Sequence, residues 1–477
     1  MKFRDAPRQL VEKYGSLFAK DYIEYCGKEF WSTDFSESHY RDALAKLLKS
    51  GEPIVLYLHI PYCAQMCYFC LCHFKISHDY GVIRDYLDVL LQEISLLQDC
   101  VEGALVNSRG RSSYPLANIR EMHLGGGSPT ILREADFKEL RDWLEQFIDF
   151  KKLDEFTIEI DPRRVGTDRM HFYADMGIDR ISFGVQDFDR GVQERINRVQ
   201  PYELLENLLR TDIRKRFKSV NFDMLIGLPG QTAKTVENTF DRVKTLRPDR
   251  VALSYMHFNP KVHKHQAVMR NDGPLPSAYE RKEMHALAVE MLEAAGYVRS
   301  GYEHFALPTD EVAKAVEAGK VQYNSLGATP GRCSYLIGLG ESAYSRVGPY
   351  HYSQSFYERD KWEGAINEGR FPVWRGHHLT PQDVLRREII QTLRSLFRLD
   401  IDALNDKYKV HLGRMMMREF AVLGELRRDG LVEFDDHGLE ITDFGRNFTN
   451  LICRVFDRYA MPEPSVENFF GGPKVEL

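Results

Sequence analysis

Four cysteines lie within one ten-residue stretch of the chain, at positions 63, 67, 70 and 72. The first three have the spacing C-x3-C-x2-C, which places three thiols on one short loop. Cysteine thiolates are the usual protein ligands of iron–sulfur clusters, and a [4Fe–4S] cluster is normally held by four of them. Three thiolates leave one iron free to bind a small molecule. The spacing therefore predicts a reactive [4Fe–4S] cluster held by Cys63, Cys67 and Cys70.

Two other uses of these cysteines fit the pattern less well. Structural zinc normally takes four ligands from two separated pairs, whereas this stretch offers one crowded group. Disulfides are a weaker alternative, because only eight cysteines occur in 477 residues and the N-terminal segment carries acids and has no apolar signal core. The role of Cys72, beside the predicted cluster, stays open.

A strand must deliver this loop, and the apolar, proline-bounded segment 54–60 is the candidate. Five further strand-like segments follow, with amphipathic helical stretches between them. The six expected strands cover residues 54–60, 121–124, 156–160, 180–185, 219–225 and 250–255. Strands that alternate with helices favour a parallel sheet with right-handed crossovers. The expected fold is thus an α/β partial (β/α)6 barrel of the TIM type.

Polar residues follow the ends of successive expected strands. The segment GGGSPT at 125–130 ends the second strand, and its glycines let the main chain approach a ligand closely. Glu159 lies near the end of the third strand, where an unpaired carboxylate would be costly to bury, so either a ligand or a neighbouring arginine should partner it. Gln186 follows the fourth expected strand, and Asp223 lies in the second half of the fifth. In a parallel barrel these ends converge on one mouth, which predicts a single site there.

This series of motifs resembles the oxygen-independent coproporphyrinogen III oxidases (dehydrogenases), a branch of the radical S-adenosylmethionine (SAM) superfamily. The resemblance covers nearly the whole chain from about residue 51. The segments that carry it are LYLHIPYC at 56–63, CYFCLC at 67–72, GGGSPT at 125–130, IEIDPR at 158–163, GVQDF at 184–188, NRVQ at 197–200, IGLPGQ at 226–231, HFA at 304–306 and WRG at 374–376.

The resemblance implies a set of site residues. Cys63, Cys67 and Cys70 would hold the cluster, and Tyr57 would join them in the catalytic centre. Two SAM molecules are implied. The first would be lined by Tyr57, Gly126, Glu159 and Tyr344. The second would be lined by Phe69, Gly127, Ser128, Gln186, Arg198, Asp223 and Met256. Such roles suit the residue types, because a carboxylate such as Asp223 can accept bonds from ribose hydroxyls and Arg198 can bind a carboxylate.

The resemblance also implies a reaction and partners. A low-potential donor such as a flavodoxin or ferredoxin would reduce the cluster, and SAM would then be cleaved to a 5′-deoxyadenosyl radical. That radical would take a hydrogen from the β-carbon of a propionate of coproporphyrinogen III. Loss of CO2 and one electron leaves a vinyl group, giving protoporphyrinogen IX for haem biosynthesis. The protein would orient the reactants and exclude water, since the cofactors do the difficult chemistry.

Several positions depart from the family pattern and keep other functions open. Met256 and Tyr344 are larger than the residues that the family usually has at these positions, and Ser128 occupies a position where the family usually has threonine. Glu341 adds a charge near Tyr344. The N-terminal segment DYIEYC at 21–26 is acidic where the family has a basic residue that could meet a propionate. The alternatives are a radical SAM methyltransferase or haem-degrading paralogue that acts on another substrate, and a haem chaperone.

Length and charge set the remaining expectations. The chain should divide into an N-terminal arm (1–50), a catalytic domain (51–374) and a mainly helical, winged-helix-like C-terminal domain (375–477) that begins with a helix at Thr380-Pro381. Acids exceed bases, 70 to 64, so general nucleic-acid affinity is not expected. No apolar run approaches the roughly 20 residues needed to span a membrane. We expect a cytoplasmic monomer.

Overall fold

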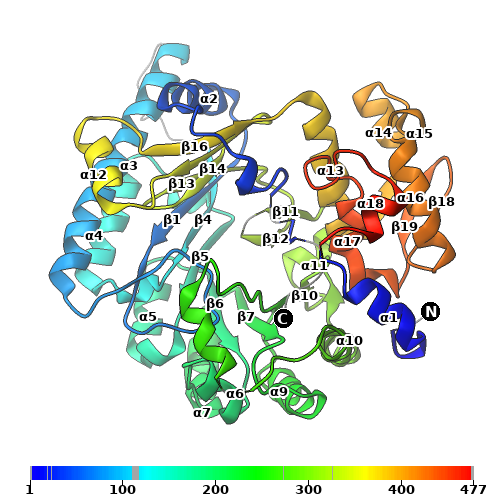
Figure 1. The fold of residues 1–477 in the computed structure, drawn as a ribbon. Coiled ribbons are helices and arrows are strands. Elements are labelled where there is room, and N and C mark those ends of the chain that lie inside the picture. Colours follow the sequence, from blue (N-terminus) through cyan, green and yellow to red (C-terminus); the bar gives the residue numbers. More distant parts are fainter. Residues whose placement is uncertain are drawn as a thin grey trace.

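The computed structural model describes residues 3–18, 20–22, 24–109, 118–271, 273–324 and 326–473. Six parallel strands lie side by side in chain order and form the middle of the large sheet (Figure 1). They are β1 (Ile54–Ile60), β4 (Ile119–Gly126), β5 (Glu155–Ile160), β6 (Arg180–Gln186), β7 (Ser219–Ile226) and β8 (Arg250–Tyr255). Each of the six predicted strands is confirmed to within two residues, because apolar runs that end in polar groups mark buried parallel strands well.

Helices connect these strands along the outer side of the curved sheet (Figure 1). They are α3 (Tyr80–Arg109), α4 (Glu134–Glu145), α5 (Thr167–Asp175), α6 (Arg190–Arg195), α7 (Tyr202–Leu208), α8 (Thr211–Arg214) and α9 (Ala233–Leu246). Leu87 and Leu90 of α3 and Phe137 of α4 are at most 1% exposed and join the strands in one apolar core. Among the described residues, no helix combines the length and apolarity that a membrane span requires.

The sheet continues beyond the six central strands and stays open. On one side, β13 (Tyr335–Leu339) runs parallel to β1, and β14 (Tyr344–Arg346), β15 (His351–Ser355) and β16 (Val373–His378) follow in antiparallel order. On the other side, β10 (His304–Ala306) and β9 (Val298–Arg299) follow β8, also antiparallel. The sheet therefore has two edges, β16 and β9, and the predicted partial barrel is confirmed.

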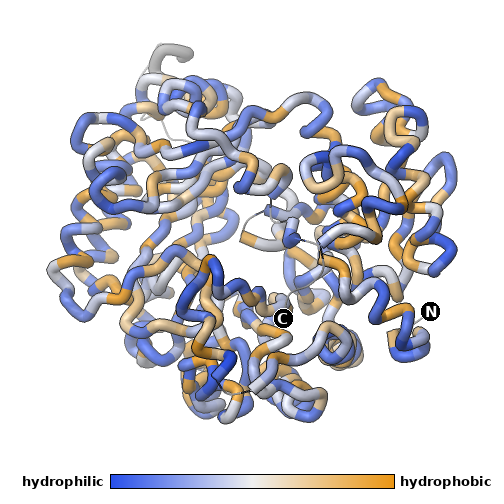
Figure 2. The backbone as a smooth tube through the Cα atoms, in the orientation of Figure 1, coloured by the Kyte–Doolittle hydropathy of each residue, from blue (hydrophilic) through white to orange (hydrophobic). Residues whose placement is uncertain are grey.

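A mainly helical unit follows β16. It contains α13 (Pro381–Leu396), α14 (Ile401–Tyr408), α15 (Leu412–Met415), α16 (Met417–Arg428), α17 (Thr449–Arg454) and α18 (Val466–Phe470), and a small sheet of β17 (Arg398–Asp400), β19 (Gly438–Ile441) and β18 (Val432–Phe434). Helix α13 begins at Pro381 after the cap residue Thr380, as its sequence predicts, and Asp383 completes a reciprocal cap with Thr380. Figure 2 shows hydrophobic stretches gathered where α13 and α17 pack together.

The N-terminal arm joins the two parts of the molecule. It contains α1 (Arg8–Gly15) and α2 (Glu37–Ser50), with short 3-10 turns at Phe3–Asp5 and Lys28–Phe30. Val11 and Tyr14 pack in the core of the C-terminal unit, whereas Trp31 stacks on Tyr352 of β15 with ring centres 5.2 Å apart. The arm therefore crosses from the helical unit to the edge of the sheet.

Candidate functional site

The four clustered cysteines lie on one loop at the mouth of the sheet, which we call the cluster loop (residues 63–72). It leaves β1 through β2 (Tyr62–Cys63) and ends before β3 (Lys75–Ile76), which pairs in parallel with β2. The Asn197 amide donates to the carbonyl of Met66 at 2.8 Å, and His265 Nε2 lies 2.8 Å from the carbonyl of Cys70. Segments that follow β6 and β8 thus hold the loop from two sides.

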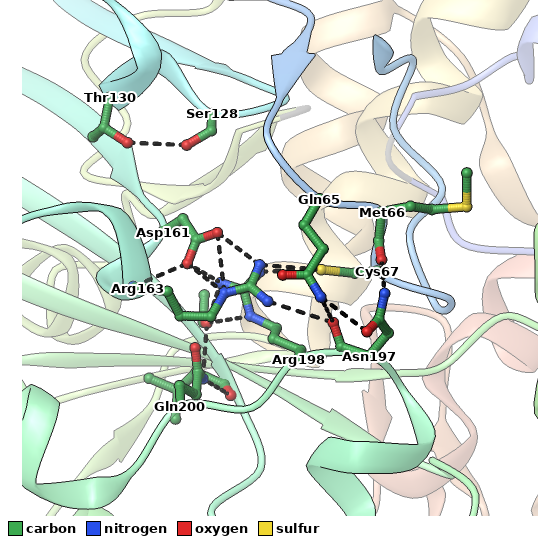
Figure 3. Close-up of polar contacts among 12 residues, drawn as sticks. Gln65, Met66, Cys67, Ser128, Thr130, Asp161, Arg163, Asn197, Arg198 and Gln200 are labelled. Carbon is green, nitrogen blue, oxygen red and sulfur yellow. Dashed lines mark hydrogen bonds and ion pairs between the residues drawn. The ribbon is translucent and has the colours of Figure 1, made fainter. Parts of the chain in front are cut away.

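Two arginines approach the most buried of the four cysteines. Arg163 and Arg198 place guanidinium nitrogens 3.5 and 3.4 Å from Cys67 Sγ (Figure 3). Both also contact Asp161, at 2.7 Å from Arg163 and 3.6 Å from Arg198. Burial alone would raise the pKa of Asp161, but these two cations hold it below its usual value. Positive charge beside a thiol favours the thiolate, which is the form that binds iron.

The other thiols also suit a metal cluster. Burial, together with the nearby Cys67 and Cys72, raises the pKa of Cys63 to about 12. Three thiolates so close together therefore need a strong positive charge, which a bound metal centre supplies. Within the described part of the chain, no three His, Cys, Asp or Glu side chains are arranged to share a single metal ion. The chemistry of several thiols on one loop, with two cations beside Cys67, fits an iron–sulfur cluster.

The glycine run brings the ends of three strands close together. Gly126 has φ of 111°, and a Cβ there would lie 2.7 Å from the His59 ring. A Cβ at Gly127 would lie 2.8 Å from the main chain of Pro61. Gly127 N donates to the carbonyl of Ile60 at 2.8 Å, and Ser128 N donates to the carbonyl of Tyr62 at 2.9 Å. The run is therefore tied to the chain that enters the cluster loop.

Tyr57 and two histidines form a hydrogen-bonded group beside this run. Tyr57 Oη lies 2.9 Å from His59 Nδ1, and His59 Nε2 lies 3.0 Å from the carbonyl of His73. Burial lowers the pKa of His59 to about 4, so the ring is neutral at pH 7. Because only Nε2 faces a carbonyl, it carries the proton and Nδ1 accepts from Tyr57.

Glu159 remains accessible within this group. Its carboxylate lies 3.0 Å from His123 Nε2 and accepts a hydrogen bond from Gly126 N at 3.1 Å. The side chain is 39% exposed, although its strand is otherwise mostly buried. The arginine partner considered from the sequence is absent from its described contacts, so an oxygen of Glu159 is available to a ligand.

A second polar group lies deeper, across β6 and β7. Asp223 accepts from Ser182 Oγ at 3.1 Å and from Asn221 Nδ2 at 2.7 Å. Burial, helped by the charge of Glu159, raises the pKa of Asp223 to about 6. These residues line a cavity of about 70 Å³ inside the sheet. The structure thus brings Glu159 and Asp223 to one interior space, as the convergence of successive parallel strands predicts.

The remaining predicted SAM-binding residues lie in three kinds of surroundings: polar, apolar and facing the N-terminal arm. Gln186 is buried at φ 67°, and Arg198 donates to the carbonyl of Gly184 at 2.7 Å. Phe69 and Met256 pack in one apolar cluster, and Met256 is only 2% exposed. Tyr344 faces the N-terminal arm, with Lys28 Nζ 3.7 Å above its ring.

Sequence reasoning assigned no role to three residues that shape the site. Arg163 and His59 lie inside the motifs IEIDPR and LYLHIPYC, which is the signal that could have identified them. Lys28 has no such signal, because its approach to Tyr344 depends on how the arm crosses the sheet.

Glu341, which departs from the family pattern by adding a charge near Tyr344, is neutralised by its neighbours. It is fully buried and pairs with Lys75, with His73 at 3.2 Å and with Arg359 at 3.8 Å. His73 and Lys75 lower the pKa of Glu341 against the effect of burial. Glu341 therefore anchors β3 beneath the cluster loop and adds no free charge to the mouth.

Comparisons with known proteins agree with this geometry. A model of the radical SAM superfamily matches residues 113–243, and one of the HemN C-terminal domain matches residues 379–448. A Pseudomonas aeruginosa protein named oxygen-independent coproporphyrinogen III oxidase is 35% identical over 421 residues, which cover 87% of this chain and 88% of that one. A Salmonella typhimurium protein of the same name is 32% identical over 96% of this chain and 97% of its own.

A solved structure shares the whole fold. The coproporphyrinogen III oxidase HemN from Escherichia coli, described as a radical SAM enzyme, superposes with a TM-score of 0.84 at 31% identity and covers 95% of this chain and 99% of its own. Identity at this level over nearly the full length places both chains in one family. The chain belongs to the oxygen-independent coproporphyrinogen III oxidase family of radical SAM enzymes.

Proposed function

We propose that this protein converts propionate groups of coproporphyrinogen III to vinyl groups by oxygen-independent oxidative decarboxylation. The observation that carries the proposal is the cluster loop, which places its cysteine thiols at the mouth of a parallel sheet, where Arg163 and Arg198 face Cys67 from outside the loop. Full-length relatives that bear this activity in their names support the substrate. When bound, the cluster supplies the electron that cleaves SAM to the 5′-deoxyadenosyl radical.

The residues of the chain would position the reactants. Tyr57, Gly126, Glu159 and Tyr344 would line the first SAM, and the exposed carboxylate of Glu159 suits its amino group. A second SAM would be lined by Phe69, Gly127, Ser128, Gln186, Arg198, Asp223 and Met256. Asp223 accepts two hydrogen bonds already and, when ionised, can accept others from ribose hydroxyls. The buried strand ends keep water away from this space.

Further features of the proposal concern the whole protein. A low-potential flavodoxin or ferredoxin would reduce the cluster, and the protein would act as a cytoplasmic monomer. The chain would divide into the arm (1–50), the catalytic domain (51–374) and the C-terminal domain (375–477). The strand β16 spans the last boundary, so the catalytic sheet would lead directly into the helical domain.

Anaerobic turnover tests this function. The cluster is reconstituted, reductant, SAM and coproporphyrinogen III are added, and the products are identified by mass spectrometry. We expect stepwise loss of carboxyl groups together with 5′-deoxyadenosine. Cys63→Ala should abolish both products, whereas Cys100→Ala, on α3 outside the cluster loop, should retain them. Formation of 5′-deoxyadenosine without decarboxylation would contradict the substrate, and methylated or ring-opened products would point to the paralogous reactions.

A further inference from the structure

A large cavity adjoins the cluster loop where the arm, β8 and the C-terminal unit meet. It has a volume of about 740 Å³, within the range of small-molecule sites. Its walls come from α1, the residues that follow β8, helix α10 (Ala278–Ala294) and the turn before α17. Leu71, between Cys70 and Cys72, forms part of the wall. A molecule in this cavity would thus lie against the cluster loop.

The cavity is strongly basic, although the whole chain is acidic. We call it the basic cavity. Its charged lining consists of the four cations Lys261, Arg270, Arg281 and Lys282, the histidines His257 and His263, and one acid, Asp21. Asp21 is already engaged, because it pairs with His257 and accepts from Asn450 Nδ2 at 2.7 Å. In a chain with 70 acids and 64 bases, this lining is complementary to a molecule with several negative charges.

Two neighbouring cations of α10 have no carboxylate partner in the described part of the chain. Arg281 donates to the carbonyl of Met256 at 2.8 Å, and Lys282 donates to the carbonyl of Asn447 at 2.7 Å. Both lie over the Tyr255 ring, at 5.4 and 4.4 Å from its centre. Burial lowers the pKa of both groups, and that of Lys282 falls to about 7. Since unpaired buried cations are costly, an anionic ligand would stabilise this arrangement.

The remaining walls of the basic cavity are apolar and aromatic. Leu17, Phe18, Leu71, Phe258 and Phe448 line it together with Tyr255. Such walls fit a broad hydrophobic body, whereas a small polar anion such as phosphate would leave them without contact. The apolar and aromatic walls, together with Arg281 and Lys282, therefore favour a macrocycle that carries carboxylates.

We propose that Arg281 and Lys282 bind the propionate carboxylates that do not react, while the reacting edge of the tetrapyrrole faces Leu71 and the cluster loop. This inference rests on the proposed function and assigns residues to its substrate. Consecutive residues on a helix point in different directions, so each cation can meet a different carboxylate. Arg281 and Lys282 would supply the positive charge that a basic residue supplies in the family and that the acidic arm segment 21–26 lacks.

Porphyrin binding to the purified protein tests this assignment without turnover. The probes are coproporphyrin III, with four carboxylates, and its tetramethyl ester, with none, titrated by fluorescence. We expect Arg281→Met and Lys282→Met each to weaken coproporphyrin binding about tenfold and to leave ester binding unchanged. Arg281→Lys and Lys282→Arg should restore most of the affinity. Arg414→Met, on α15 outside the basic cavity, is the matched control and should bind both probes like the wild type.

Several outcomes would overturn the inference. Unchanged coproporphyrin binding in both methionine variants would overturn it. An equal loss of affinity for the tetramethyl ester would also overturn it, because that result indicates general damage to the cavity. If the wild type decarboxylates coproporphyrinogen III and both variants do so with unchanged KM, only this inference fails. If the wild type cleaves SAM but binds neither probe, both this inference and the proposed substrate fail.

Discussion

Replacing Gly126 with alanine tests how tightly the glycine run is built into the site. The native φ of 111° is strained for any residue with a Cβ, at roughly 1–3 kcal/mol. The new Cβ would also lie 2.7 Å from the His59 ring. That ring is held by Tyr57 and by the carbonyl of His73, so it cannot turn away without losing hydrogen bonds. Overpacking of this kind costs about 1–3 kcal/mol more.

The expected loss of unfolding free energy is therefore about 2–6 kcal/mol, the sum of the two contributions. Urea unfolding followed by circular dichroism measures it. Gly364→Ala makes the same chemical change inside helix α12 (Arg359–Asn367), where a Cβ meets nothing within 4 Å. That control should be about 0.5–1 kcal/mol more stable than the wild type. A Gly126→Ala protein within 0.5 kcal/mol of the wild type would refute the reasoning.

Four further substitutions, at Arg198, Asp223 and Glu93, probe ionisable groups of the catalytic sheet and its helices. Arg198→Met should slow cluster reconstitution, measured as iron bound over time, because Cys67 loses a cation 3.4 Å from its sulfur. Reconstitution at the wild-type rate would contradict a role of Arg198 in cluster assembly. Burial raises the pKa of Asp223 to about 6, so ionising this residue lowers the unfolding free energy of the wild type as pH rises from about 4 to 6. Asp223→Asn should therefore become more stable relative to the wild type over that window. Parallel pH profiles of the two proteins in chemical unfolding would contradict this expectation. Glu93 is fully buried with its pKa raised to about 8, so it is protonated at pH 7. Glu93→Gln should therefore change the unfolding free energy by less than about 1 kcal/mol. Glu93→Leu leaves the Gly340 amide without its acceptor and should cost about 1–3 kcal/mol. Equal losses of unfolding free energy in the two variants would argue against a neutral Glu93.

The central sheet could be predicted from the sequence because its signals are local. The strands β1 and β8 are short apolar segments, and both have the expected bounds. Parallel strands also fix where their ends meet, so the approach of Glu159 and Asp223 to one interior cavity followed from their positions alone.

Features that depend on distant pairing could not be predicted in this way. The strand β13 lies beside β1 although roughly 280 residues separate them, and no local pattern encodes that neighbour. The position of Lys28 over Tyr344 depends on the path of the arm, and the cations of α10 reach the basic cavity only through tertiary packing. Burial of Glu341 beside Lys75 likewise required the folded structure.

Isotope transfer from the substrate tests the central claim most directly. Coproporphyrinogen III deuterated at the β-carbons of its propionates is incubated anaerobically with the reduced protein and SAM, and 5′-deoxyadenosine is analysed by mass spectrometry. The proposed reaction predicts one deuterium in the 5′-deoxyadenosine formed with each carboxyl group lost. Decarboxylation accompanied by unlabelled 5′-deoxyadenosine would contradict hydrogen abstraction at this carbon and, with it, the proposed function.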